Sequence, residues 1–186
     1  MISSRLTDRF TISAEQLAAN ILGAKAVGLD CSPLLVQSGI DPDVLNNPHA
    51  RIPHSAFIKF RLLLCQVLND ENAGFTEQTA PLGTLVYACR AVMASYNLKG
   101  VLNQYSHFHY LFSESVSYRF CEDGDLAYFG ISVLNPSQSD HHAFLENTVQ
   151  FIFSFSLWLT GRPFMLRRID YSFSRPAYGR EYADLI

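Results

Sequence analysis

Residues 115–134 have the sequence SVSYRFCEDGDLAYFGISVL, and this stretch decides the fold. From Val116 to Phe120, apolar and polar residues alternate, which is the pattern of a β-strand with one buried face. Residues 122–125 contain an Asp-Gly pair that tolerates positive φ and therefore favours a tight turn. The return strand runs from Leu126 to Leu134, where Asn135-Pro136 ends it. The pattern predicts an antiparallel β-hairpin.

Helical periodicity precedes the hairpin. Ser13 and Gln16 form a capping-box pair that predicts a helix ending at Gly28. Ser32-Pro33 and Asp41-Pro42 each place a cap before a proline at the first helical position, so two short helices are expected there. Three longer helices are then predicted: one that follows an extended segment at residues 51–53 and ends at residues 72–74, one over about 81–94, and one over 98–112.

Residues 140–160 form one long predicted helix, polar at its start and apolar on nearly every face by its end, so other elements must enclose it. Gly161 and Pro163 end this helix, and residues 164–173 are predicted as a third strand. We therefore expect one α+β domain over residues 1–186. Its helical N-terminal half, about 1–112, packs on a small antiparallel sheet and a long helix, about 113–186.

Composition limits the function. Of the 186 residues, 48% are hydrophobic and only 17% are charged, and the net charge is -3. Such a chain has enough apolar surface for a large core, and its charge does not draw it toward nucleic acid. The high apolar fraction also suggests that part of the surface is covered by a partner, such as a second copy of the chain.

Cysteine usage and the N-terminus favour a cytoplasmic location. The four cysteines are far apart and contain no CxxC pair, so reduced thiols are expected, with disulfides or a metal as alternatives. Met1 is followed by polar and charged residues rather than by a signal peptide. The most apolar run, 149–159, is too short to cross a bilayer.

Catalytic and metal motifs are weak. His107 and His109 lie two apart on a predicted helix and therefore diverge, and the adjacent pair His141-His142 diverges in any element. No carboxylate or cysteine completes a coordination sphere at standard spacing, so polar residues at a helix boundary are the simpler interpretation, and a heme ligand is a weaker alternative. Neither a nucleophile elbow nor a phosphate-binding glycine motif is present. No catalytic residue, metal or cofactor is predicted.

Arginines gather near the C-terminus. A site for phosphate or a nucleic-acid backbone is one interpretation, but no aromatic-basic platform accompanies them. We favour a solvated strand edge, where charges block edge-to-edge pairing. The five residues are Arg162, Arg167, Arg168, Arg175 and Arg180.

Aromatic residues concentrate after position 87, and they suit either an ordinary core or an apolar pocket for a small molecule. Polar residues that interrupt these apolar elements need a partner when buried, and a ligand can supply one. The best candidates for ligand contact are Tyr105, His109 and Glu146. Arg119 and Gln150 are further candidates, although Arg119 falls on the solvent face of its strand.

Several short motifs, in order, resemble the N-terminal effector-binding domain, often labelled arabinose-binding, of one branch of the bacterial AraC-type transcriptional regulators. The resemblance covers about residues 30–180. One departure is Asn97, where the family usually has Thr before the helix that starts at Leu98. The matching pieces are Gly39-Ile40-Asp41, Leu45, Arg51-Ile52-Pro53, Ala73-Gly74-Phe75, Leu82-Gly83, Tyr87-Ala88, Ser95, Leu98, Val101-Leu102, Tyr105, Glu146 and Phe173-Ser174-Arg175-Pro176.

The resemblance implies a ligand-sensing and dimerising domain of a regulator, not an enzyme. Its partners would be a small-molecule effector of unknown identity and a second copy of the chain. DNA would be contacted only through a C-terminal helix-turn-helix domain that this sequence does not contain. Two alternatives remain: a ligand-free interaction module that uses the same apolar surface, and a small enzyme with a site hidden in the aromatic region.

Overall fold

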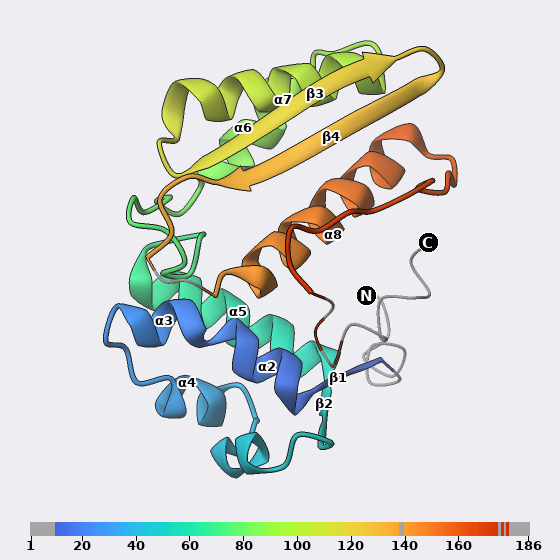
Figure 1. Cartoon of the computed structure of the whole chain (residues 1–186). Helices are drawn as coiled ribbons and strands as arrows, with labels where there is room; N and C mark the ends of the chain where they lie inside the picture. The colour runs from blue at the N-terminus through green and yellow to red at the C-terminus, as the bar shows by residue number, and fades with distance from the viewer. Residues whose placement is uncertain (1–9, 138–139, 175, 177, 179–186) are drawn as a thin grey trace.

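Short elements make up the first part of the chain in the computed structural model, which describes residues 10–137, 140–174, 176 and 178 (Figure 1). Ser13 caps the first helix as predicted, since its Oγ accepts a hydrogen bond from the Gln16 backbone N–H at 3.2 Å. The predicted continuous helix breaks at Ile21 into two pieces. The elements are β1 (Thr11–Ser13), α2 (Ala14–Asn20), α3 (Leu22–Ala26), α4 (Ser32–Gln37), η1 (Pro42–Asn46) and β2 (Arg51–Pro53).

β1 and β2 form a small antiparallel sheet, which the sequence did not predict, with Ile12 opposite Ile52. Three longer helices follow close to their predicted places: α5 (His54–Leu68), α6 (Thr84–Val92) and α7 (Leu98–Phe112). The Asn97 side chain caps α7 by accepting the Gly100 N–H at 2.9 Å, so the departure from the family's Thr keeps the cap.

The predicted hairpin is confirmed as β3 (Val116–Asp123) and β4 (Leu126–Val133). Cross-strand partners Tyr118 and Ile131 share one face, and this face is at least half-buried, while Arg119 points to solvent. Gly124 has a φ of +57° in the turn, which the Asp-Gly pair accommodates. Helix α7 packs mainly on β3, and α8 (His142–Thr160) packs on β4.

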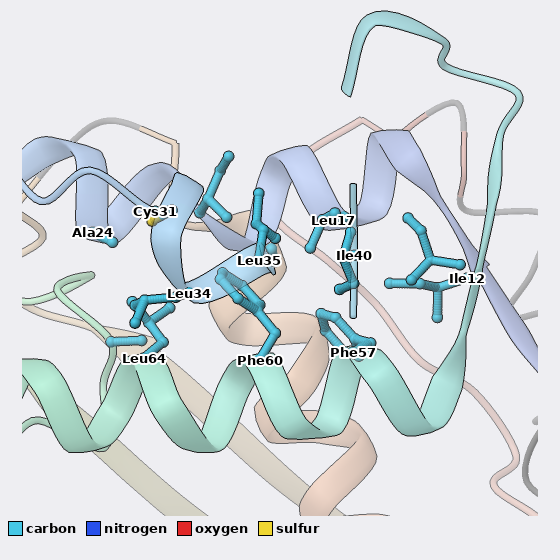
Figure 2. Packing of buried hydrophobic residues seen from close by; sticks show 14 of the residues in the cluster. Ile12, Leu17, Ala24, Cys31, Leu34, Leu35, Ile40, Phe57, Phe60 and Leu64 are labelled. Carbon is cyan, nitrogen blue, oxygen red and sulfur yellow. The ribbon is translucent and has the colours of Figure 1, made fainter. Parts of the chain in front are cut away.

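Helix α8 contributes to two apolar clusters, and it runs between the N-terminal helices and the β3–β4 hairpin (Figure 1). Ala143 and Phe144, near its start, belong to a cluster with the N-terminal helices and the first residue of β3. Ile152, two turns later, belongs to a second cluster with α6 and α7. Figure 2 shows the first cluster, in which the side chains of α5 point toward α2 and α4. The fold is α+β, as predicted from the hairpin and the helical periodicity.

The predicted third strand, 164–173, is wrong. Within the described residues, β3 and β4 form a sheet of two strands, and residues 164–173 run back along α8 without strand pairing (Figure 1). Phe164 contacts Phe153 with ring centroids 5.5 Å apart, and Phe173 stacks on His142 at 3.8 Å. Arg167-Arg168 puts two charged residues side by side, which breaks the alternation that a half-buried strand needs.

Candidate functional site

A cavity of about 410 Å³ lies between the segment that leads into α6, the C-terminal end of α7 and the start of β3. Tyr87 and Phe112 line it and are 64% and 66% exposed, so they form its solvent-facing rim. The size falls within the usual range for small-molecule sites. The lining residues are Asn72, Gln78, Thr79, Ala80, Pro81, Leu82, Gly83, Thr84, Tyr87, Phe108, His109, Phe112, Ser113, Val116 and Tyr118.

Two neighbouring carboxylates hold one wall of this cavity. Asp70, which is buried, accepts backbone N–H groups of Asn72, Gly74 and Ala80 at 3.0, 2.8 and 2.7 Å. Glu71 accepts the N–H groups of Gly83 and Leu85 at 2.8 and 2.6 Å. The carboxylate of Glu71 therefore sits at the N-terminal end of α6, where the helix dipole favours negative charge. Together the pair fixes the path of residues 72–85.

The side chains of Gln78 and Ser115 tie the same wall to the hairpin. The backbone N–H of Gln78 donates to Ser115 Oγ at 3.1 Å, and its side-chain Oε1 accepts the Glu114 N–H at 2.6 Å. Ser115 also accepts, through its carbonyl, the Leu134 N–H at 2.7 Å. Sequence analysis missed these residues because their role depends on contacts across the chain; no local motif marks them.

His109 lines the cavity from α7. It lies between two tyrosine rings, with centroid distances of 4.6 Å to Tyr105 and 4.3 Å to Tyr118. Among the described residues its Nε2 atom, which is buried, has no hydrogen-bond partner. Burial lowers the pKa of the imidazole to about 4, so the ring is neutral at physiological pH.

Tyr105 and Tyr118 form a rigid backing for His109. Their rings meet edge to face, 5.1 Å apart, and their hydroxyls are hydrogen-bonded to each other. Burial raises the pKa of both phenols. Tyr105 is 2% exposed and does not line the cavity, so it positions its neighbours from behind.

The structure separates the third predicted ligand residue from the other two. Glu146 is buried near the start of α8. Burial raises the pKa of the Tyr178 phenol, and the charge of Glu146 and its hydrogen bond to Tyr178 raise that pKa further. Its neighbour Asn147 donates to Asn20 Oδ1 of α2 at 2.6 Å, so this part of α8 faces the N-terminal helices. Arg119 and Gln150 are exposed and do not line the cavity.

The other sequence candidates lie outside the cavity. His107 is exposed, and within the described ranges no group of three or more His, Cys, Asp or Glu side chains is placed to hold a metal ion. All four cysteines are free. Arg162, Arg167 and Arg168 are exposed, whereas Arg175 and Arg180 lie outside the described residues. No helix in the part of the chain that the structure describes has the length and apolarity to span a bilayer.

An α+β domain with a solvent-open cavity lined largely by aromatic and apolar side chains has the features of a domain that binds a small molecule. The family model described as the arabinose-binding domain of AraC transcription regulators, N-terminal, matches residues 28–186. The chain belongs to this family. Comparisons with curated proteins and with solved structures gave no match.

Proposed function

We propose that this domain senses a small-molecule effector in the cavity at His109 and self-associates as part of a transcriptional regulator. The observation that carries the proposal is the cavity itself, which aromatic, apolar and uncharged polar side chains from three parts of the chain line, His109 among them.

The arrangement around the cavity also supports a sensing role. Its walls come from three separate parts of the chain: the segment before α6, the end of α7 and the start of β3. A ligand that contacts all three favours the arrangement in which they are close, and a ligand shifts an equilibrium only by such differential binding. The effector would therefore act on how the α6–α7 layer sits on the hairpin.

Self-association is supported by the apolar side chains that α6, α7 and the turn between them leave exposed. An exposed apolar patch rimmed by polar residues is typical of an interaction surface. A second copy is the partner that the family membership favours. The residues are Val86, Tyr87, Met93, Tyr96, Tyr110, Leu111 and Phe112.

The test is a thermal-shift screen against a panel of metabolites. We expect at least one compound to raise the melting temperature of the wild type, because ligand binding to the folded state stabilises it. The same compound should raise the melting temperature of His109→Phe by less, because His109 lines the cavity and the substitution replaces its polar ring with an apolar one. His107→Phe is the matched control, since His107 is exposed on the same helix.

Two further variants test whether the other predicted ligand residues, Tyr105 and Glu146, affect ligand binding. Tyr105→Ala should weaken the ligand-induced shift, because Tyr105 supports His109. Glu146→Ala should leave that shift intact, because Glu146 does not line the cavity. If no compound stabilises the wild type and side chains prove to fill the cavity, this proposal fails and the domain is a ligand-free interaction module instead.

A further inference from the structure

We infer that the amide side chains of Gln78 and Asn72 select the ligand of this cavity, and that they recognise an uncharged group that both accepts and donates a hydrogen bond. The inference rests on the proposed function and names the chemistry of the effector together with two residues that determine specificity. A carboxamide and a hydroxyl both have this chemistry. The inference follows from the lack of charge in the lining and from the way in which each amide is held.

The lining of the cavity carries no charged side chain at neutral pH. Among the described residues that line it, none is Asp, Glu, Lys or Arg. Burial lowers the pKa of the His109 imidazole to about 4, so this ring is neutral near pH 7. The carboxylates of Asp70 and Glu71 do not line the cavity and already accept backbone N–H groups. A charged ligand would therefore lose part of its hydration here without meeting an opposite charge.

The amide of Gln78 supplies a hydrogen-bond donor. Its Oε1 accepts the backbone N–H of Glu114 at 2.6 Å, and because a backbone N–H can only donate, this contact fixes which end of the amide is the oxygen. The Nε2 atom has no hydrogen-bond partner among the described residues. Gln78 is an exposed residue of the lining, so its NH2 group is open to solvent or to a ligand.

The amide of Asn72, a second lining residue, supplies an acceptor. Its Nδ2 donates to Thr76 Oγ1 at 2.8 Å, and the Thr76 hydroxyl gives its only proton to the Gln78 carbonyl oxygen at 2.8 Å. The hydroxyl must therefore accept from Asn72, which assigns the nitrogen to Thr76 and leaves Oδ1 without a partner among the described residues. Oδ1 is not one of the buried unpartnered atoms of that part of the chain, so it is accessible.

Both amides are held in place before a ligand binds. Thr76 is buried and connects the Asn72 side chain to the Gln78 main chain, while Asp70 fixes the same segment through the N–H groups of Asn72 and Ala80. Such preorganisation favours a ligand group that accepts from Gln78 and donates to Asn72. A carboxylate has no proton for Asn72, and a protonated amidine has no lone pair for Gln78.

The experiment is a titration of the chain near pH 7.5, followed by protein NMR, with four probes that share a phenyl ring: benzamide, benzyl alcohol, benzoate and benzamidine. The ring suits the aromatic side chains of the lining, such as Phe108 and Phe112. We expect at least one of the two neutral probes to bind about fivefold or more tightly than either ion, because each ion leaves one amide without a partner. The order of the two neutral probes then distinguishes a carboxamide from a hydroxyl.

Gln78→Glu tests the assignment of the donor. The new carboxylate keeps an oxygen for the Glu114 N–H and replaces the free donor with an acceptor. We expect this variant to bind benzamidine about fivefold or more tightly than either neutral probe, which reverses the order found for the wild type. Gln104→Glu is the matched control: it adds the same charge at an exposed position of α7 that does not line the cavity, so the wild-type order should remain.

Each other outcome overturns the inference. If benzoate or benzamidine binds the wild type as tightly as the neutral probes, the cavity does not select an uncharged group. If Gln78→Glu keeps the wild-type order, Gln78 does not recognise the polar group. If none of the four probes binds while a compound from the metabolite panel does, the proposed function stands and the inferred chemistry is wrong; if nothing binds, both fail. The comparison of probes uses the wild type alone, so it does not depend on the folding of a variant.

Discussion

At the scale of single residues, the site depends on an imidazole kept neutral by burial. The pKa of His109 is about 4 in the folded chain, against 6.5 for a free imidazole. Between these values the unfolded chain binds a proton that the folded chain does not, so folding stability falls as the pH is lowered through this window.

The pH dependence of unfolding tests this point. From pH 7 to pH 5 the free energy of unfolding of the wild type should fall by about 2 kcal/mol more than that of His109→Phe, which has no proton to bind there. Urea unfolding followed by circular dichroism measures both proteins. Equal pH dependence of the two would mean that His109 is already solvated and titrates normally in the folded chain.

Asp70 provides a second prediction. Asp70→Asn should lower the free energy of unfolding by about 3 kcal/mol, since an amide nitrogen would then face a backbone N–H that the carboxylate now accepts. Chemical denaturation checks it. Asp41→Asn is the matched control: Asp41 is an exposed cap, and asparagine caps helices about as well as aspartate, so a change within about 0.5 kcal/mol is expected. A similar loss in both variants would contradict the account.

How far the sequence predicts the site also depends on the residue. Tyr105 and His109 lie one turn apart on a helix whose bounds the sequence gives well, so their proximity follows from local periodicity. Glu146 lies on a helix that is apolar on most faces, and periodicity does not tell which part of it faces which neighbour. Gln78 acts through Glu114 and Ser115, far along the chain, so no local pattern announces it. Asp70 accepts backbone N–H groups two, four and ten residues further on, so only part of its role is local.

At the scale of elements, helices and the hairpin could be predicted because their signals are local. The cap at Ser13 and the start signal at Leu98 each place the beginning of a helix within a few residues, and the Asp-Gly pair places the turn of the hairpin. The segment at 164–173 shows the limit of this approach. Apolar residues there pack on α8 rather than in a sheet, and β1 pairs with β2 across about forty residues for reasons that neither strand's own sequence contains.

The close crossing of α3 and the turn at residues 73–75 gives a prediction at this scale. A Cβ on Gly74 would lie 2.5 Å from the Gly23 carbonyl oxygen, whereas a Cβ on Gly28 would meet nothing within 4 Å. Both glycines have φ near +80°, so alanine costs about 1–2 kcal/mol of backbone strain at either position. Gly74→Ala should cost about 2 kcal/mol more, because two elements must move apart. Thermal and urea unfolding of the two variants measures both losses of stability. Equal losses would contradict the prediction, because they would mean that the crossing has room for a Cβ.

At the scale of the whole molecule, large apolar side chains are exposed on several elements. Tyr110 is 80% exposed on α7 and Trp158 is 68% exposed on α8, although the apolar end of that helix was expected to be enclosed. We predict that the chain dimerises, and that sedimentation at tens of micromolar shows a species near twice 20.9 kDa. A monomer across that range would leave the apolar surface to a different partner.

The central claim is that the cavity at His109 holds a small molecule, and a crystal structure of the chain grown with the most stabilising compound of the metabolite panel tests it most directly. The account predicts density for that compound between α7 and the segment before α6, in contact with the His109 side chain. Side chains that fill the cavity, with the compound bound elsewhere or absent, would contradict it.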